Sequence, residues 1–383
     1  RGDNGISLLP VEEYGEDFPI KVAGQIYDFD SSNYGIDVKS AKRMSRPDKF
    51  GIAATGLALK SARLHIGNQN GDVSPEDVDI CLGVGIGGHT TSMNEMERYL
   101  GGKKIKPFAV PQIMPNSAAA QIGLHYGIKG ESITTNSACA SSGTAIGDAY
   151  YRIKGGRDII VVGGLEACIN KFSLSAFDSM RALSRSEEPF YKVYDEDSEG
   201  FVMGEGAGML ILESEEHALQ RGAPIYAEII GYGASTDAQH IASPDLEGRQ
   251  LSRAVKFSLK DAGISPEEIK YVNSHGTGTM NDGIESKVMK DVFGNLTSEI
   301  PISSTKPMIG HLLGGATAVE TIATILAMNY NFLPGTINLE NPINGLDYIT
   351  ETRTHQYTPI ALKFSSGFGG HNTSLVLKRY ERS

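Results

Sequence analysis

Apolar and polar residues follow two different periods along this chain, and the two periods alternate. Short apolar runs bounded by turn residues predict buried strands, whereas longer stretches with apolar residues at helical spacing predict helices. The predicted strands cover residues 78–85, 131–138, 158–167 and 269–276, and a final pair lies in 359–380 around a Gly-rich turn. The predicted helices cover residues 48–66, 116–128, 141–156, 248–264 and 315–330, and another opens within 265–269.

This alternation of strands and helices indicates an α/β architecture whose sheets are covered on both faces. A strand, turn and helix with candidate chemistry occur near residues 132–154, and a strand ending in a histidine occurs near 271–279. These segments predict two similar halves that face each other, although no direct sequence repeat is visible. We place the halves at residues 1–230 and 231–383, and the segment most typical of a loop is 184–201.

Composition narrows the class of protein. The 383 residues are 40% hydrophobic and 21% charged, as in an ordinary globular protein. We find no run of about 18 uncharged apolar residues that would predict a membrane span, and no secretory signal at the start. The formal net charge of −11 argues against nucleic acid as the main partner, because phosphate binding needs a basic surface.

The chain has three cysteines, Cys81, Cys139 and Cys168, which are odd in number and far apart. This spacing fits neither a disulfide framework nor a zinc site, so we predict no metal and a reducing, cytoplasmic setting. Cys81 and Cys168 lie in strand-like runs, and we interpret both as small buried hydrophobes.

Residues 39–49 gather five cations in an otherwise acidic chain, and two interpretations stay open. The cations are Lys39, Lys42, Arg43, Arg46 and Lys49. They are either a local docking patch for an acidic partner or the solvated start of a helix.

Cys139 occupies a position that favours reactivity. It lies between the predicted strand ending near Thr135 and the helix beginning near Ser141. Unpaired N–H groups and the dipole at a helix N-terminus stabilise a thiolate, so we expect a lowered pKa for this thiol. The small neighbours Ala138, Ala140 and Gly143 leave space around the sulfur. The position therefore predicts a nucleophile at a sharp strand-to-helix turn.

Three later motifs place further polar groups in Gly-rich turns. His275 ends a strand in NSHGTGTMND, and Lys306 and His311 bracket a glycine in SSTKPMIGHLLGG. Phe368 lies in the turn SSGFGGHN, where glycines allow the backbone to approach a site closely. A buried helix carrying Glu320 follows the lysine, so these residues predict a polar network.

These motifs occur together and in one order, and with them the chain resembles the β-ketoacyl-acyl carrier protein synthase family. The similarity runs from about residue 5 to the end, in the branch with two active-site histidines. The motifs that show this similarity are NSACASSG, FVMGEGAG, HGTGT, STKPMIGHLLGG followed by AVE, and GFGGHN. The resemblance implies a thiolase fold, with two pseudo-repeated halves in an αβαβα layered arrangement that is usually dimeric.

The resemblance also implies roles for individual residues. Cys139 matches the acylated nucleophile, and His275 and His311 match the pair that drives decarboxylation of a malonyl extender. Lys306 matches the lysine supporting this pair, and Glu320 its structural neighbour. Phe368 matches a gate whose backbone N–H completes an oxyanion hole with that of Cys139. The implied substrate-binding residues are Thr277 and Thr279, whose hydroxyls match those that bind the phosphopantetheine arm, and Gly369.

The chain departs from the family pattern in several places. The strand and helix that usually precede the GISLL segment are absent, so we expect one sheet to lack a strand. Ser366 replaces a phenylalanine in SSGFGG, and Gln239 and Ala242 replace an aromatic residue and a threonine in DAQHIASP. We expect these changes near the pocket, where they favour a chain bearing oxygen or double bonds.

The implied activity is decarboxylative Claisen condensation, which extends an acyl chain on Cys139 by two carbons. The SSGFGG motif favours the catalytic ketosynthase of a type II polyketide or aryl polyene system, and the alternative is ordinary fatty acid elongation. The implied partners are an acyl carrier protein and a second subunit, either identical or resembling a chain-length factor. No cofactor is expected, since phosphopantetheine arrives on the carrier.

Other classes of protein fit less well. A thiolase needs a second catalytic cysteine near the C-terminus, and no cysteine follows Cys168. The initiating synthases use histidine and asparagine, whereas His311 occupies the second position here. A cysteine hydrolase has no use for the Lys306 and His311 loop. A chain-length partner would lack the nucleophile, whereas Cys139 is present. A non-catalytic carrier-binding subunit stays a remote alternative.

Overall fold

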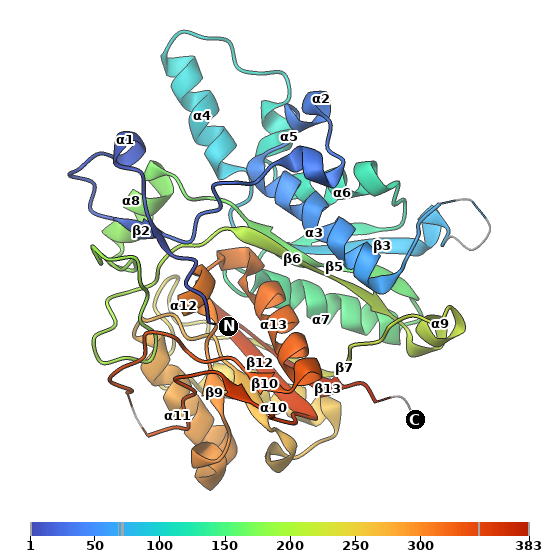
Figure 1. The fold of residues 1–383 in the computed structure, drawn as a ribbon, viewed down its shortest axis with the longest axis vertical. Helices are drawn as coiled ribbons and strands as arrows, with labels where there is room; N and C mark the ends of the chain where they lie inside the picture. Colours follow the sequence, from blue (N-terminus) through green and yellow to red (C-terminus); the bar gives the residue numbers. More distant parts are fainter. Residues whose placement is uncertain (1, 68, 70–72, 344, 382–383) are drawn as a thin grey trace.

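The computed structural model describes residues 2–67, 69, 73–343 and 345–381. Its core consists of two mixed β-sheets with α-helices between them and on their outer faces (Figure 1). No helix in these described ranges combines the length and the apolar character needed to cross a membrane.

The first sheet has four strands in the order β4-β3-β5-β6. β3 (Val78–Val84) is parallel to β4 (Ser132–Thr135) and to β5 (Ile159–Glu166), and β6 (Gly206–Glu213) is antiparallel to β5. Every residue of β3 and β5 is buried, as expected for strands covered on both faces.

The second sheet has five strands in the order β7-β13-β12-β8-β9. β8 (Tyr271–Asn273) is parallel to β9 (Ile302–Ser303) and to β12 (Ile360–Gly367). β13 (His371–Arg379) is antiparallel to β12 and to β7 (Ala227–Thr236). The hairpin register leaves residues 368–370 as the turn between β12 and β13, where the sequence predicted it.

The two sheets repeat one arrangement. The order β4-β3-β5-β6 matches β9-β8-β12-β13 in both sequence order and strand direction. β7 has no counterpart in the first sheet among the described residues. The predicted division at residues 230 and 231 falls inside β7, which pairs with β13 from Ala227 onward.

Two helices lie between the sheets. α7 (Ser141–Lys154) and α13 (Ala316–Tyr330) each contact both sheets (Figure 1). α7 fits this layer because small residues face its neighbours: a Cβ added at Gly147 would lie 2.2 Å from the Tyr232 ring. The two central helices therefore pack closely against the sheets. Their positions bring together the two chain segments that lead into them, one before α7 and one before α13.

Outer helices complete five layers. α3 (Arg46–Ala62) and α6 (Ser117–Tyr126) cover the first sheet, and α10 (Arg249–Ala262) and α11 (Asn281–Phe293) lie on the side of the second. α10 ends at Gly263, whose φ of 69° is the left-handed cap that glycine favours. This layering is the predicted thiolase-type arrangement.

The remaining elements are shorter or peripheral. They are α1 (Val11–Tyr14), α2 (Val38–Ala41), α4 (His89–Leu100), α5 (Ala109–Ile113), α8 (Lys171–Ser179), α9 (Glu215–Gln220), α12 (Lys306–Ile309), and the paired strands β1 (Ser7–Leu8) with β2 (Val22–Ala23) and β10 (Phe332–Leu333) with β11 (Arg353–Thr354). Two local predictions were wrong. Residues 265–269 form only a 3₁₀ turn at Pro266–Glu268, and Cys168 lies beyond the end of β5 at Glu166.

Candidate active site

The predicted catalytic residues come from corresponding places in the two halves. Cys139 lies in the connection from β4 to α7, and Lys306 and His311 lie in the matching connection from β9 to α13. His275 follows β8 and Phe368 follows β12. These connections meet at a cavity of about 600 Å³ whose lining includes Cys139, His275, Thr277, Thr279, His311 and Phe368.

The turn at Cys139 is held by its own backbone and by the end of β12. Ala138 adopts a φ of 51°, an uncommon left-handed conformation for alanine. The Ser141 hydroxyl donates to the Ala138 carbonyl at 2.6 Å and accepts from the Ser137 N–H at 3.0 Å. A Cβ on Gly367 would lie 2.9 Å from the Cys139 nitrogen, so only glycine allows β12 to approach this turn.

The resting side chain of Cys139 is a thiol. Burial raises the pKa of Cys139 to about 12, while Lys306 and the backbone N–H of Phe368 act in the opposite direction. The expected lowering of this pKa was therefore wrong, because Cys139 is only 9% exposed and desolvation outweighs the favourable charges. The sulfur must lose its proton only when a substrate and a proton acceptor are in place.

The two histidines face each other across the cavity. Their ring centroids are 5.2 Å apart with planes at 82°, and the Phe201 ring lies 5.3 Å from His311. Burial, followed by the charge of Lys306, lowers the pKa of both imidazoles well below the usual value. Both rings are therefore neutral near pH 7, and each has one N–H to donate.

Lys306 and Glu320 lie behind His275 rather than in the cavity lining. The Lys306 ammonium donates to Glu320 Oε1 at 2.5 Å and to the His275 carbonyl, and its Nζ lies 3.4 Å from His275 Nδ1. Because an ammonium has only protons to offer, Nδ1 accepts, and we assign the ring proton of His275 to Nε2. Lys306 thus orients His275 and fixes its tautomer.

The HGTGT turn is held by two carboxylates that sequence reasoning missed. Asp282 accepts from the N–H of Thr277 at 2.8 Å, and Glu285 accepts from the N–H of Gly276 at 3.0 Å. Both carboxylates project from α11, and burial raises the pKa of each. The available signal was two acids three residues apart directly after the turn. The Thr277 and Thr279 hydroxyls lie 2.9 Å apart at the cavity wall.

Phe368 belongs to a stack of aromatic rings, two members of which sequence reasoning missed. Its ring stacks on Phe177 at 6.1 Å, and Phe177 meets Phe201 edge-on at 5.4 Å. Gly369, predicted to bind substrate, does not line the cavity, and its N–H donates to the Ile241 carbonyl at 2.8 Å. Gly369 therefore shapes the turn, while Phe368 presents its ring and N–H to the site.

The three unusual positions of the sequence have different locations. Ser366 and Ala242 line the cavity, as predicted, whereas Gln239 is exposed and lies outside the lining. The Ser366 hydroxyl donates to Asn372 Oδ1 at 2.9 Å. Gln239 is therefore not part of the cavity wall, although Ala242 of the same motif is.

The basic cluster divides into exposed and structural cations. Lys39, Lys42 and Arg43 are exposed. Arg46 pairs with buried Glu205 at 2.6 Å, and Lys49 is half-buried, with a pKa lowered by desolvation. The interpretation of all five cations as one free patch was wrong. If Arg46 turned away to bind a partner, the buried Glu205 carboxylate would lose its charge partner.

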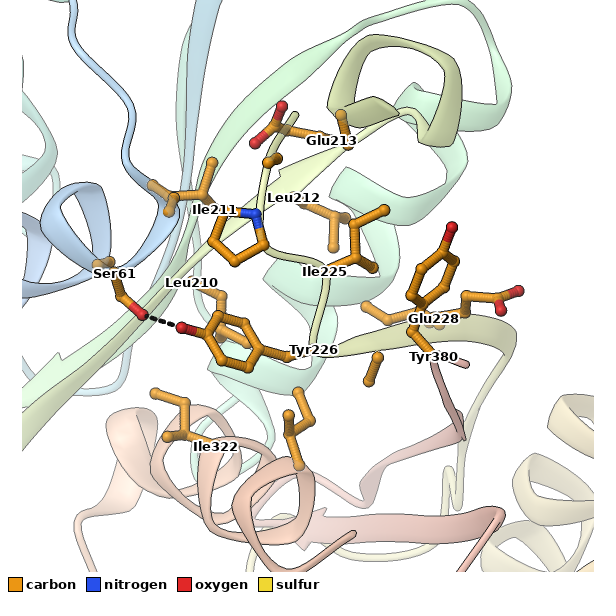
Figure 2. A pocket seen from close by; sticks show the side chains of 18 of the residues that line it. Ser61, Leu210, Ile211, Leu212, Glu213, Ile225, Tyr226, Glu228, Ile322 and Tyr380 are labelled. Atoms are coloured by element: carbon orange, nitrogen blue, oxygen red, sulfur yellow. Dashed lines mark hydrogen bonds between the residues drawn. The ribbon is translucent and has the colours of Figure 1, made fainter. Parts of the chain in front are cut away.

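A second cavity, of about 540 Å³, lies elsewhere and contains none of the predicted catalytic residues. Figure 2 shows its apolar wall along β6, with Leu210, Ile211 and Leu212 among its labelled residues. Tyr226 bonds Ser61 across it at 3.0 Å. The grouping of a thiol and two imidazoles assigns the active site to the first cavity.

Comparisons with known proteins agree with this geometry. Residues 1–218 match the N-terminal domain and residues 226–340 the C-terminal domain of β-ketoacyl synthase. The chain is 40% identical to 3-oxoacyl-[acyl-carrier-protein] synthase 2 of Synechocystis sp., over 99% of the chain and 92% of that protein. The enzyme of the same name from Staphylococcus aureus is 37% identical, over 100% of the chain and 92% of that protein.

Solved structures give the same result. A β-ketoacyl synthase from Burkholderia phymatum superposes with a TM-score of 0.90 at 32% identity, covering 99% of this chain and 93% of that one. The ishigamide ketosynthase/chain length factor gives a TM-score of 0.90 at 30% identity, with the same coverage. The two domain matches, the full-length identity and the cavity with Cys139, His275 and His311 together show that this chain belongs to the β-ketoacyl synthase family.

Proposed function

We propose that the protein is a condensing enzyme that extends an acyl chain, held on Cys139, by two carbons from a malonyl thioester. One observation carries the proposal: a single cavity brings together the Cys139 thiol, the His275 and His311 imidazoles and the backbone N–H of Phe368. This set supplies a nucleophile, donors for an enolate and a donor for a tetrahedral oxyanion.

Acyl loading is the first step. The Cys139 sulfur attacks the carbonyl of an acyl thioester, its proton passes to the departing carrier thiolate, and an acyl-cysteine remains. The oxyanion formed in this attack accepts hydrogen bonds from the N–H groups of Cys139 and Phe368. Stabilisation at the transition state offsets the cost of ionising a buried thiol.

Condensation is the second step. The malonyl thioester loses carbon dioxide, and the electron pair of the broken bond forms an enolate whose oxygen accepts from the His275 and His311 N–H groups. The enolate carbon then attacks the acyl-cysteine carbonyl. Collapse of that adduct breaks the carbon–sulfur bond, and the released thiolate takes up a proton from solvent. The product is a 3-oxoacyl thioester on the carrier.

The pantetheine arm arrives as part of the substrate, so this reaction needs no resident cofactor. Thr277 and Thr279 present hydroxyls at the cavity wall, where they would bond the amides of the arm. A cytoplasmic setting completes the proposal and is supported by three free cysteines. The test is to combine the purified protein with acyl-carrier and malonyl-carrier and measure 3-oxoacyl product and carbon dioxide. Absence of both products would overturn the proposal.

An acyl carrier protein is the proposed partner, with a second ketosynthase-like subunit beside it. Among similar solved structures is a type II polyketide acyl carrier protein in complex with its ketosynthase, 30% identical to this chain. Another holds a ketosynthase with its chain length factor. We propose that the acidic carrier docks on the exposed cations Lys39, Lys42 and Arg43, of which Arg43 stacks over Phe108 at 4.8 Å.

Reversing the docking charges is expected to weaken the use of the carrier without slowing chemistry. Lys42→Glu with Arg43→Glu should raise KM for the acyl-carrier several-fold at low salt and leave kcat within about twofold, because exposed charges act mainly on encounter. Steady-state kinetics at two salt concentrations measure this. The matched control is Lys260→Glu on α10, for which KM should not change. Equal KM values in the double variant and the control would exclude this surface.

The chain that the enzyme extends has two candidates. A polyketide- or polyene-type chain is our first candidate, because Ser366 and Ala242 place a hydroxyl and a small side chain in the cavity wall. A saturated fatty chain is the second, favoured by the 40% identity to a 3-oxoacyl-[acyl-carrier-protein] synthase 2.

Primers of equal length are expected to separate the two candidates. Keto- or enoyl-bearing acyl-carriers should be elongated with a higher kcat/KM than the saturated primer, because the Ser366 hydroxyl can turn its proton from Asn372 toward an oxygen on the chain. Ser366→Phe should abolish the preference and retain elongation of saturated primers. Competition assays read by mass spectrometry measure the ratio. Preference for the saturated primer by the protein purified alone would assign it to fatty acid elongation.

A further inference from the structure

Lys363 is a lysine inside the second sheet, where lysines are rarely found without a partner. It lies on β12, and its side chain is fully buried. The ammonium has three oxygen neighbours: Glu320 Oε2 at 2.6 Å, the Ser274 carbonyl at 2.9 Å and the Phe364 carbonyl at 2.7 Å. Burial lowers the pKa of Lys363 to about 8, with Glu320 acting in the opposite direction, so the lysine is still mostly charged near pH 7.

The same carboxylate serves a second lysine. Glu320 Oε1 accepts from Lys306 at 2.5 Å while its Oε2 pairs with Lys363, and all three side chains are at most 1% exposed. Lys363 donates to the carbonyl of Ser274, and Lys306 donates to the next carbonyl along the chain, that of His275. The two lysines therefore hold two consecutive peptide groups at the point where the chain presents His275 to the cavity.

The charges of this cluster do not cancel. Two ammonium groups and one carboxylate leave one positive charge beside two neutral imidazoles. The acids of α11, Asp282 and Glu285, lie near the cluster and accept from backbone N–H groups of the HGTGT turn; burial raises their pKa values to about 6 and about 7, so Glu285 is only partly ionised near pH 7. Since Glu320 compensates one lysine, Lys363 supplies the excess positive charge behind the catalytic histidines.

We propose that Lys363 is a positioning residue for the condensation: it shares Glu320 with Lys306, fixes the backbone that carries His275, and keeps this buried cluster positively charged. The inference rests on the proposed function. A positive cluster keeps both imidazoles neutral and attracts the negative charge that develops on the enolate oxygen. Both imidazole pKa values are lowered by burial first, and Lys363 contributes in the same direction.

The test replaces Lys363 with methionine, which keeps the length of the side chain and removes the charge. We expect kcat for malonyl-carrier decarboxylation to fall about tenfold or more through misplacement of His275, with KM nearly unchanged. The acid limb of the pH profile should move to higher pH, because the imidazoles become easier to protonate. Lys378→Met, at an exposed position on β13, is the matched control and should change neither.

Two further variants separate charge from structure. Glu320→Gln raises the cluster charge to two and should move the acid limb to lower pH. The double variant Lys363→Met with Glu320→Gln restores one positive charge and should return the limb toward the wild-type position, even with a lowered kcat. If Lys363→Met does not fold, Glu320→Gln still carries the test, because its acid limb should move to lower pH. The inference would be overturned if the acid limb of the decarboxylation pH profile did not move to higher pH when the cluster loses positive charge and to lower pH when it gains it.

Failure of this inference can be told from failure of the proposed function. NMR titration of histidine-labelled protein reads the imidazole pKa values without any substrate, and Lys363→Met should raise them. Unchanged imidazole pKa values would overturn the role of Lys363 even in an active enzyme. A wild-type protein that releases no carbon dioxide from malonyl-carrier would instead overturn the proposed function.

Discussion

Cys139→Ala should abolish acyl loading and condensation together while the protein still releases carbon dioxide from malonyl-carrier. The proposed decarboxylation uses His275 and His311 and needs no sulfur, whereas both carbon–sulfur steps do. Loss of the nucleophile should lower condensation by at least about 10³-fold, as in other enzymes with covalent intermediates. Retained carbon dioxide release then shows that the variant is folded. Intact-protein mass spectrometry measures loading, and product analysis measures condensation.

The control for this experiment is Cys81→Ala. Cys81 is buried in β3 against Asp148 and is not part of the cavity lining, and its pKa is raised to about 12, mainly by burial. This variant should load and condense like the wild type. Peptide mapping should place the acyl group of the wild-type protein on Cys139. An adduct on Cys81 or Cys168 would show that the nucleophile has been assigned to the wrong residue.

His275→Ala and His311→Ala are expected to separate the two half-reactions in the opposite sense. Each removes one N–H donor to the enolate oxygen, and loss of one such donor costs about 10²–10³-fold in other enzymes. Carbon dioxide release should fall by this factor, while transfer of the acyl group to Cys139 stays detectable. Single-turnover loading and carbon dioxide release are measured on the same preparations.

The matched control is His65→Ala, which removes an exposed imidazole outside the site and should change neither half-reaction. Below the ordinary histidine pKa the wild-type enzyme should still decarboxylate, because burial keeps both catalytic imidazoles neutral there. If the two histidine variants lose loading and decarboxylation to the same extent, the imidazoles do not have separate roles.

The sequence predicted most elements and the order of the site residues, because both depend on local patterns. The pattern of apolar and polar residues predicted β3, β5, α10 and α13 within a few residues of their observed bounds. The Gly-rich turns correctly marked the ends of strands. Long-range packing could not be predicted in this way. Lys363 interrupts a strand with a charge, and nothing in its neighbourhood shows that Glu320, 43 residues earlier, would pair with it.

The same limit explains one wrong expectation and one incomplete one. The pKa of Cys139 depends on how deeply the turn is buried, and burial follows from the approach of β12, a strand more than 200 residues later. Gln239 was placed near the pocket from its motif, yet the backbone turns its side chain outward while Ala242 in the same motif lines the cavity. The DAQHIASP motif thus predicted correctly that this segment lies at the cavity. It did not predict which of its side chains point into the cavity.

The matching strand orders have a consequence for the solution behaviour of the protein. β7 covers the outer edge of β13, whereas β6, the corresponding strand, ends its sheet beside the hollow shown in Figure 2. Unpaired backbone N–H and C=O groups along such an edge can bond an additional extended peptide. If the apolar side chains of that peptide alternate, they can be buried in the apolar cavity beside the edge. Among the described residues, β6 is therefore the edge at which a further extended segment would add to the first sheet.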